Sequence, residues 1–283
     1  MTLLQAIVLG IVQGLTEFLP ISSTAHLRIV PVLFGWTFAY NPEHPHDPGA
    51  AFTAVIQLGT TLALVIYFWR ELVHVAVAWV RGLYDRSVRG SLEYRMGWYL
   101  ILATIPIGVV GLIFRDQIET GARNLWIIAI VMIALALVLF WAEQVGHRNR
   151  EEEDINTADA TTVGLAQTLA LIPGSSRSGV TITAGLFRGL TREAAARFSF
   201  LLSIPAVVLS GLFEARKIGE HNGPGIGLTV LAALFAFIVG LASIHWLMRW
   251  LAHHTTYIFI GYRIAVGALL LVLLGTGVVS ATK

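Results

Sequence analysis

Two stretches of this chain interrupt apolar segments with proline and polar side chains. The first is Gln13-Gly-Leu-Thr-Glu17-Phe-Leu-Pro20-Ile-Ser22-Ser23-Thr24-Ala-His26, and the second is Pro173-Gly174-Ser175-Ser176-Arg177-Ser178-Gly-Val-Thr181. The surrounding regions, 2–34 and 161–190, are otherwise apolar, yet each break leaves halves shorter than the roughly 20 residues of a spanning helix. Irregular backbone survives at membrane depth only where protein or a water-filled cavity covers it. Both regions are therefore predicted to form re-entrant helical hairpins.

Composition places the chain in the membrane class. Hydrophobic residues make up 56% of its 283 residues and charged residues 13%, whereas about 25% charged residues is usual in soluble domains. Six further apolar stretches come close to the length of a span: 50–69, 96–114, 124–142, 198–213, 224–248 and 255–279. The expected fold is an all-α polytopic membrane protein with six transmembrane helices and two re-entrant hairpins, forming one domain over residues 1–283.

Cysteine usage and charge exclude several classes of function. The chain has no cysteine, which rules out disulfides, thiolate metal sites and a cysteine nucleophile. The net charge is only +2 and the basic residues are spread along the chain, so no basic tract indicates nucleic-acid binding.

The two broken regions resemble each other, which predicts an internal repeat. Gly10-Ile-Val-Gln13 precedes the first break and Gly164-Leu-Ala-Gln167 precedes the second. Each hairpin is followed by three expected spans, and because three is odd, the second half would be inverted relative to the first. The predicted halves cover about 1–143 and 160–283, with the acidic segment 144–159 as a linker.

The distribution of basic residues predicts the orientation. One set of loops and span ends carries eleven arginines: Arg70, Arg81, Arg86, Arg89, Arg95, Arg148, Arg150, Arg188, Arg192, Arg197 and Arg249. The opposite set carries five basic residues: Arg115, Arg123, Arg216, Lys217 and Lys283. The positive-inside rule then places the loop at 70–95 in the cytoplasm and both termini outside it.

The first motif combines a carboxylate, hydroxyls and an imidazole. Gln13 and Glu17 are four residues apart and so share a helix face. After the proline a helix can restart with Ser22 or Ser23 near its N-cap. His26 follows Ser23 by three residues, so its imidazole and that hydroxyl are expected to face the same way.

The second motif has the features of an anion site. A helix that starts there presents free N–H groups and a partial positive charge. Arg177 adds a planar guanidinium that fits phosphate oxygens, and Thr181 follows four residues later on the same face. If the two tips meet, Glu17 and Arg177 offset each other's charge and a bound phosphate completes the balance. Charges at mid-bilayer cost about 2.5–3.5 kcal/mol on insertion scales and are usually functional.

Structural explanations compete with these roles. Serine and threonine in membrane helices often bond the backbone or pack helices. His26 is also compatible with a structural internal histidine, and Arg177 with a side chain that reaches an interface. Arg263 lies inside a predicted span and is expected to be a structural ion-pair partner, while Gln57 is expected to bond a neighbouring helix.

At these residues the chain resembles the bacterial undecaprenyl-diphosphate phosphatase family of the bacitracin-resistance type. The two family signatures stand here at 13–17 with 20–26, and at 173–181, and the length and hydrophobic profile also agree. The second signature is long and specific. Gln13 stands where glutamate is common and Ala25 where glycine is common, and the first of these departures counts against a two-carboxylate metal site.

The resemblance implies hydrolysis of undecaprenyl (C55) diphosphate to undecaprenyl phosphate and inorganic phosphate, which recycles the lipid carrier of peptidoglycan synthesis. It further implies a homodimer in the bacterial inner membrane, with a site that opens to the periplasmic or external side. The isoprenoid diphosphate and membrane lipids are the expected partners. The alternative left open is a transporter or flippase of a lipid phosphate that uses the same mid-membrane anion site.

The residues receive their roles as hypotheses. The catalytic candidates are Glu17, Ser23, His26 and Arg177. Arg177 would hold the diphosphate, Ser23 would attack or position water, His26 would be a general acid or base, and Glu17 would orient His26 or a metal. The substrate-binding candidates are Gln13, Ser22, Thr24, Gly174, Ser175, Ser176, Ser178 and Thr181.

The cofactor and one rival phosphatase class complete these expectations. A divalent cation, Mg²⁺ or Ca²⁺, is a candidate cofactor that Glu17 alone would hold weakly. Membrane acid phosphatases place a histidine six residues after a Ser-Arg arginine, and position 183 is threonine, so that pattern fails.

Overall fold

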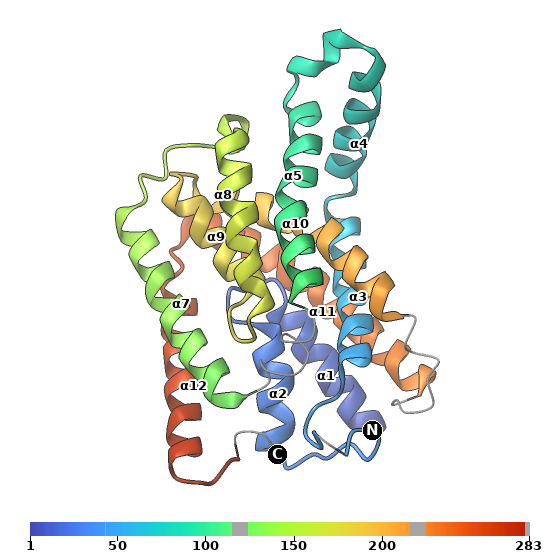
Figure 1. Cartoon of the computed structure of the whole chain (residues 1–283), viewed down its shortest axis with the longest axis vertical. Helices are drawn as coiled ribbons and strands as arrows, with labels where there is room; N and C mark the ends of the chain where they lie inside the picture. Colours follow the sequence, from blue (N-terminus) through green and yellow to red (C-terminus); the bar gives the residue numbers. More distant parts are fainter. Residues whose placement is uncertain (43, 115–123, 216–224, 281–283) are drawn as a thin grey trace.

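The chain is helical throughout the residues that the structure describes. This computed structural model covers residues 1–42, 44–114, 124–215 and 225–280 and shows no named strand among them (Figure 1). The longer helices are α1 (Leu3–Thr16), α2 (Ser23–Leu33), α3 (Ala50–Tyr67), α4 (Trp69–Tyr84), α5 (Leu92–Ile113), α7 (Leu125–Val145), α8 (Thr157–Gln167), α9 (Arg177–Phe187), α10 (Arg192–Ala215), α11 (Ile226–His253) and α12 (Tyr257–Gly275). Short 3₁₀ turns are η1 (Arg86–Gly90), η2 (Glu152–Asp154) and η3 (Thr168–Leu171).

Five of the described helices are long and apolar enough to cross a membrane. They are α3, α5, α7, α11 and α12, with mean hydropathies between 1.8 and 2.9. The all-helical membrane class is thus confirmed. The sixth expected span, 198–213, falls within α10, and the six-span count remains a prediction.

The two broken regions form pairs of half-helices. The first pair is α1 and α2, with 14 and 11 residues, and the second is α8 and α9, with 11 residues each. At about 1.5 Å per residue, each helix spans between about half and about two thirds of the ~30 Å bilayer core. Figure 1 shows the turn between α8 and α9 reaching the blue segment between α1 and α2. That the pairs are re-entrant and the halves inverted stays a prediction.

Small residues let α11 pack closely on both α1 and α3. A Cβ atom on Gly10 of α1 would lie 2.3 Å from the Ala232 carbonyl oxygen. A Cβ atom on Gly59 of α3 would lie 2.3 Å from the Ala233 carbonyl oxygen. Close backbone approach of this kind is a main source of helix association in membranes, and here it joins the N-terminal half-helix to the C-terminal part of the chain.

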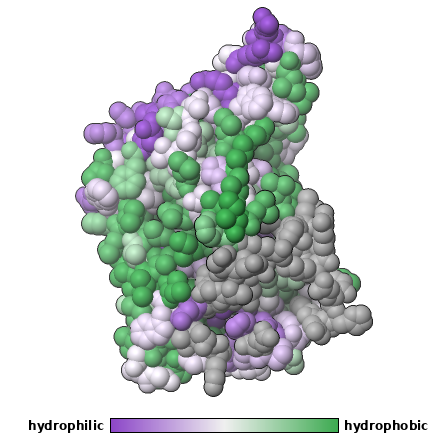
Figure 2. All heavy atoms as spheres, viewed as in Figure 1, coloured by the Kyte–Doolittle hydropathy of each residue, from purple (hydrophilic) through white to green (hydrophobic). Residues whose placement is uncertain are grey.

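The loop expected at 70–95 proves to be structured. It contains α4, η1 and the first turn of α5, and the α4–α5 pair projects from the rest of the molecule (Figure 1). Exposed Val73, Val77 and Val80 recur along α4 at helical spacing, and charged Arg70, Glu71 and Arg81 lie on the same helix, so the segment is an amphipathic helix and not a loop. Figure 2 shows hydrophilic residues gathered at this projecting end, above a broad hydrophobic band.

Two buried carboxylates, Asp159 and Glu143, bind arginines at the arginine-rich end of the molecule, next to the linker. Asp159 of α8 is fully buried and accepts from Arg150 and Arg188. Glu143 of α7 accepts from Arg192 of α10 and from the Thr256 hydroxyl. Four arginines of the set that is expected in the cytoplasm, including Arg148 beside Glu143, therefore have structural partners. The basic residues Arg115, Arg123, Arg216, Lys217 and Lys283 lie outside the described residues.

Candidate active site

The two hairpin tips are the turns between α1 and α2 and between α8 and α9. They meet through a largely buried ion pair. Glu17 follows the last residue of α1 and Arg177 is the first residue of α9. The guanidinium of Arg177 donates to Oε1 of Glu17. Glu17 is 9% exposed and the Arg177 side chain is 17% exposed, so both charges are largely removed from water and each compensates the other. The structure thus brings together the carboxylate of one motif and the cation of the other.

The second carboxylate oxygen of Glu17 organises the first tip. Oε2 accepts from the Ser23 hydroxyl at 2.6 Å and from the Gln13 amide nitrogen at 2.8 Å. Gln13 is fully buried, and its Oε1 has no hydrogen-bond partner among the described residues. Glu17 is therefore held on three sides, with Ser23 directly against it.

Both tips use the same local device to start their second helix. Ser22 and Ser176 precede α2 and α9 with positive φ angles of 76° and 66°. Their hydroxyls accept from the N–H groups of Ala25 and Gly179, three residues further on. An N-cap of this kind satisfies one free N–H and leaves the helix start with its partial positive charge. Left-handed φ values outside glycine cost about 1–3 kcal/mol and cluster at functional sites.

Arg263 of α12 joins the two tips through backbone carbonyls. This arginine is fully buried and donates to the carbonyl oxygens of Met132, Pro20, Gly174 and Ser175, at 3.1, 3.4, 3.1 and 3.0 Å. The sequence suggested an ion-pair partner, whereas these four hydrogen bonds within the described residues are all with carbonyls. A guanidinium has five donors in a plane, which lets one side chain bind carbonyls of both hairpins.

His26 has partners that the sequence did not predict. Its Nδ1 lies 2.7 Å from the Ser22 carbonyl oxygen and its Nε2 lies 2.6 Å from the hydroxyl of Tyr262 on α12. The described contacts of the imidazole therefore include neither Ser23 nor Glu17. Tyr262 was missed because no local motif contains it; its position beside a charged residue within an apolar span was the only available signal.

Comparison with known proteins identifies the family. The model of the bacitracin resistance protein BacA matches residues 6–269. The chain belongs to the BacA family. It is 47% identical over 319 residues to a Nocardia farcinica protein named undecaprenyl-diphosphatase, covering 100% of this chain and 99% of that protein. Proteins with the same name from Mycobacterium bovis and Mycolicibacterium smegmatis are 50% and 48% identical, over 98% and 99% of this chain and 99% and 100% of theirs.

The remaining hydroxyls of this BacA-family site fall into two groups. Ser178 donates to the Leu19 carbonyl oxygen at 3.1 Å and lies 3.2 Å from the Ser176 hydroxyl, so it links the tips. The hydroxyl of Thr181 lies 2.6 Å from that of Ser199 and bonds the helix backbone, which places it behind the tip.

Three other candidate substrate-binding residues differ in exposure or conformation. Thr24 is exposed beside the first tip, whereas Ser175 is buried within the second. Gly174 has a φ of 91°, and a Cβ there would lie 2.7 Å from the Ile128 carbonyl oxygen. Only glycine combines that backbone with that close approach.

Metal ligands are sparse at the BacA-family site. Within the described residues, no group of three or more His, Cys, Asp or Glu side chains could hold a metal ion. Glu17 is the carboxylate of the site, and both of its oxygens already accept hydrogen bonds. The unpartnered Oε1 of Gln13 adds one oxygen of the type that Mg²⁺ and Ca²⁺ prefer. These donors fit at most a weakly held ion.

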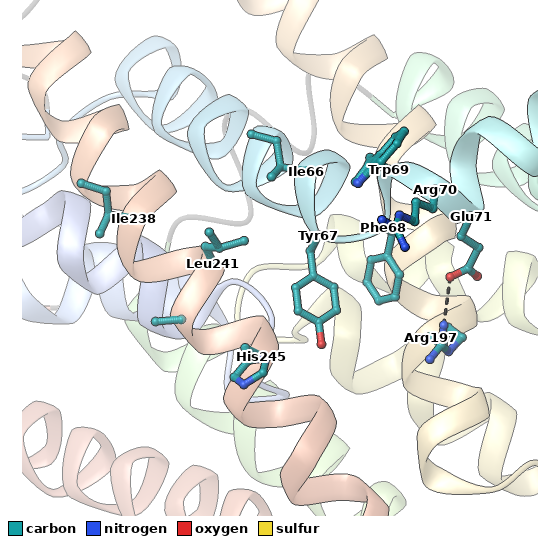
Figure 3. Close-up of a pocket in the computed structure, with 11 residues that line it drawn as sticks. Ile66, Tyr67, Phe68, Trp69, Arg70, Glu71, Arg197, Ile238, Leu241 and His245 are labelled. Carbon is teal, nitrogen blue, oxygen red and sulfur yellow. Dashed lines mark hydrogen bonds and ion pairs between the residues drawn. The ribbon is translucent and has the colours of Figure 1, made fainter.

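A cavity lies outside the candidate site, at the junction of α3 and α4. Its volume is about 890 Å³, and its lining residues include Tyr67, Glu71, Arg197 and His245 but none of the candidate site residues. Figure 3 shows Tyr67 directed toward His245, and a bond between Glu71 and Arg197 that measures 2.9 Å. Arg197 also pairs with Glu152 of the linker at 3.3 Å. Burial, and next the charge of Glu71, raise the pKa of Glu152 to about 7.

Proposed function

We infer that this protein is an integral-membrane enzyme that hydrolyses undecaprenyl diphosphate to undecaprenyl phosphate and inorganic phosphate. The observation that carries the inference is the buried contact of Arg177 with Glu17, which in turn bonds Ser23, in a chain about 50% identical over its full length to proteins named undecaprenyl-diphosphatase. The reaction belongs to the recycling of the cell-wall lipid carrier in the bacterial membrane. No comparison favours the alternative of a lipid-phosphate transporter.

The tips supply what a diphosphate anion needs. Arg177 offers a planar set of donors, and the starts of α2 and α9 offer two helix N-termini. Little of the guanidinium's capacity is used by Glu17, since arginine has five N–H donors. Charge that develops on the transferring phosphoryl group would meet donors already in place, which is the main contribution proteins make to phosphoryl transfer.

Glu17 is the best-placed base for Ser23. The hydroxyl donates to Oε2 at 2.6 Å, within the range required of a general base. In the attack, the proton of Ser23 or of a water molecule passes to Glu17, and a new P–O bond forms at the terminal phosphorus. The bridging P–O bond breaks, and its electron pair leaves with the lipid monophosphate. Ser23 is then either the nucleophile or the group that positions the water. If Ser23 attacks, the phosphoryl group is held on its oxygen until a water molecule attacks the same phosphorus, breaks the Ser23 P–O bond and releases inorganic phosphate.

The proposal also covers the orientation in the membrane, the span count, the re-entrant hairpins, the homodimer and the cation. The arginine-rich end, where Arg70, Arg81 and Arg89 gather with α4 and η1, supports a cytoplasmic location for that end and an external opening for the site. The six-span count, the re-entrant hairpins and the homodimer follow from the family resemblance. If a divalent cation binds, Glu17 and Gln13 would hold it, and it would supply additional charge neutralisation for the diphosphate.

Phosphate release by the purified protein tests the function. In detergent there is no second compartment, so a transporter releases no inorganic phosphate from undecaprenyl diphosphate, whereas a phosphatase does. We expect release by the wild type, a loss of about 100-fold or more in Ser23→Ala, and no loss in Ser87→Ala, whose serine is exposed at the projecting end. A folded wild-type protein that releases no phosphate would refute the function.

A further inference from the structure

The imidazole of His26 contacts Tyr262, a residue to which the proposed chemistry gives no role. A carbonyl oxygen only accepts, so the contact of Nδ1 with Ser22 assigns the ring hydrogen to Nδ1. In neutral His26 the Tyr262 hydroxyl then donates to Nε2, across 2.6 Å. The one basic nitrogen of His26 is therefore directed at Tyr262, while Ser23 donates to Glu17.

Tyr262 is held in place by its neighbour in the chain. Arg263, the next residue of α12, bonds the carbonyls of Pro20 and Gly174 and so fixes this turn of α12 against both tips. The rings of His26 and Tyr262 are stacked, with centroids 5.5 Å apart and planes 13° from parallel. Both rings therefore have a defined mutual orientation, set by packing as well as by the hydrogen bond.

The pair also connects the buried site with its surroundings. His26 is 7% exposed, whereas Tyr262 is 42% exposed. A hydroxyl can donate to neutral Nε2 or accept from protonated Nε2. The same contact can therefore serve both charge states of the imidazole without rotation of the ring.

We propose that Tyr262 is a positioning residue of the phosphatase reaction that acts through His26, the candidate general acid or base of the first motif. It fixes the Nδ1-protonated tautomer and keeps Nε2 in one orientation. The inference rests on the proposed function and extends it to α12, which carries neither sequence motif. A packing role for the ring alone makes a different prediction, because Tyr262→Phe keeps the stacked ring and removes only the hydroxyl.

The test measures kcat and KM for undecaprenyl diphosphate between about pH 5 and pH 9 for the full chain in detergent. We expect Tyr262→Phe to lower kcat about tenfold or more with little change in KM. The acidic limb of its kcat profile also shifts, because the hydroxyl bonds Nε2 with different strength in the neutral and the protonated imidazole. The matched control is Tyr257→Phe on the same helix, whose hydroxyl accepts from Gln144 at the exposed start of α12; it should behave as the wild type.

A second variant background, His26→Gln, distinguishes a positioning role of Tyr262 from a role in folding. In His26→Gln, adding Tyr262→Phe should cause no further loss, because the hydroxyl has no imidazole to position. Wild-type kcat and pH profile in Tyr262→Phe would overturn the proposal, and so would a loss that persists undiminished in the His26→Gln background. Failure of the phosphatase function itself is distinguishable, because the wild type would then release no phosphate.

Discussion

The two hairpin tips share a backbone plan but differ in chemistry. Each second half-helix starts after a serine with positive φ, Ser22 or Ser176, whose hydroxyl caps the N–H three residues on. A glutamine lies nine residues before each serine, at Gln13 and Gln167. Four residues after the first glutamine stands a glutamate, whereas Leu171 occupies the corresponding place in the second tip. A common scaffold thus presents a carboxylate on one side and none on the other.

The residue that follows each N-cap serine differs between the two tips and indicates a different role for each tip. Ser23 is the first residue of α2 and Arg177 is the first residue of α9. Both positions lie where free N–H groups favour an anion, so the helix starts are alike and the side chains decide the role. In the proposed mechanism the second tip binds the phosphate charge and the first tip supplies the base and the hydroxyl, while Glu17 contacts residues of both tips. Neither tip alone has a complete site.

The largest effect is expected from removing the carboxylate that only the first tip has. Glu17→Gln keeps the size of the side chain but cannot accept the proton of Ser23, and it leaves Arg177 without a counter-charge. We expect kcat to fall by about 10²–10⁴-fold, the range of general-base catalysis. Glu93→Gln, at an exposed position in the first turn of α5, is the control. Wild-type turnover by a folded Glu17→Gln protein would show that the first tip is not the reactive one.

A smaller effect is expected from a hydroxyl behind the second tip. The sequence placed Thr181 among the phosphate-binding residues, but its hydroxyl bonds Ser199 and the Arg177 carbonyl. Thr181→Val should therefore lower the free energy of unfolding by about 1 kcal/mol and leave KM nearly unchanged. Thr183→Val removes the bond to the Gly179 carbonyl on the same helix and should behave alike. A selective rise in KM for Thr181→Val would return that hydroxyl to the binding site.

The smallest effect concerns a region outside both tips. The pKa of Glu152 is raised to about 7, chiefly by burial, so the folded state favours its neutral form. This contribution to stability is complete below the ordinary carboxyl pKa and is lost as pH rises through 7. Glu152→Gln should therefore raise Tm at pH 8.5 and flatten the pH dependence of Tm, without changing kcat. Exposed Glu153→Gln is the control, and an unchanged pH dependence in Glu152→Gln would contradict the assignment.

Local patterns made most of the site predictable, and distant contacts did not. The membrane class and the two breaks followed from hydropathy and proline, and the pairing of Glu17 with Arg177 followed from the cost of burying either charge alone. His26 was expected beside Ser23 because spacing along a helix was the only guide. Its contact with Tyr262 joins residues 236 positions apart, and no local pattern predicts such a pair.

Two further differences have the same origin. The carbonyl contacts of Arg263 join α12 to backbone groups of three other segments, so they depend on how the helices assemble. The segment 70–95 was expected to be a loop because its arginines mark it as polar, yet exposed valines at helical spacing, such as Val73 and Val77, make α4 amphipathic. The number of basic residues in a segment indicates on which side of the membrane it lies, whereas the periodicity of its apolar residues indicates whether it is helical.

A double-mutant cycle tests most directly whether the two tips form one site. The measurement is kcat/KM for phosphate release by wild type, Glu17→Gln, Arg177→Lys and the double variant. If the ion pair joins the tips in one site, the double variant loses much less than the product of the single losses, with a coupling of about 1–3 kcal/mol. Losses that simply multiply would show that Glu17 and Arg177 act independently, and the single shared site would be wrong.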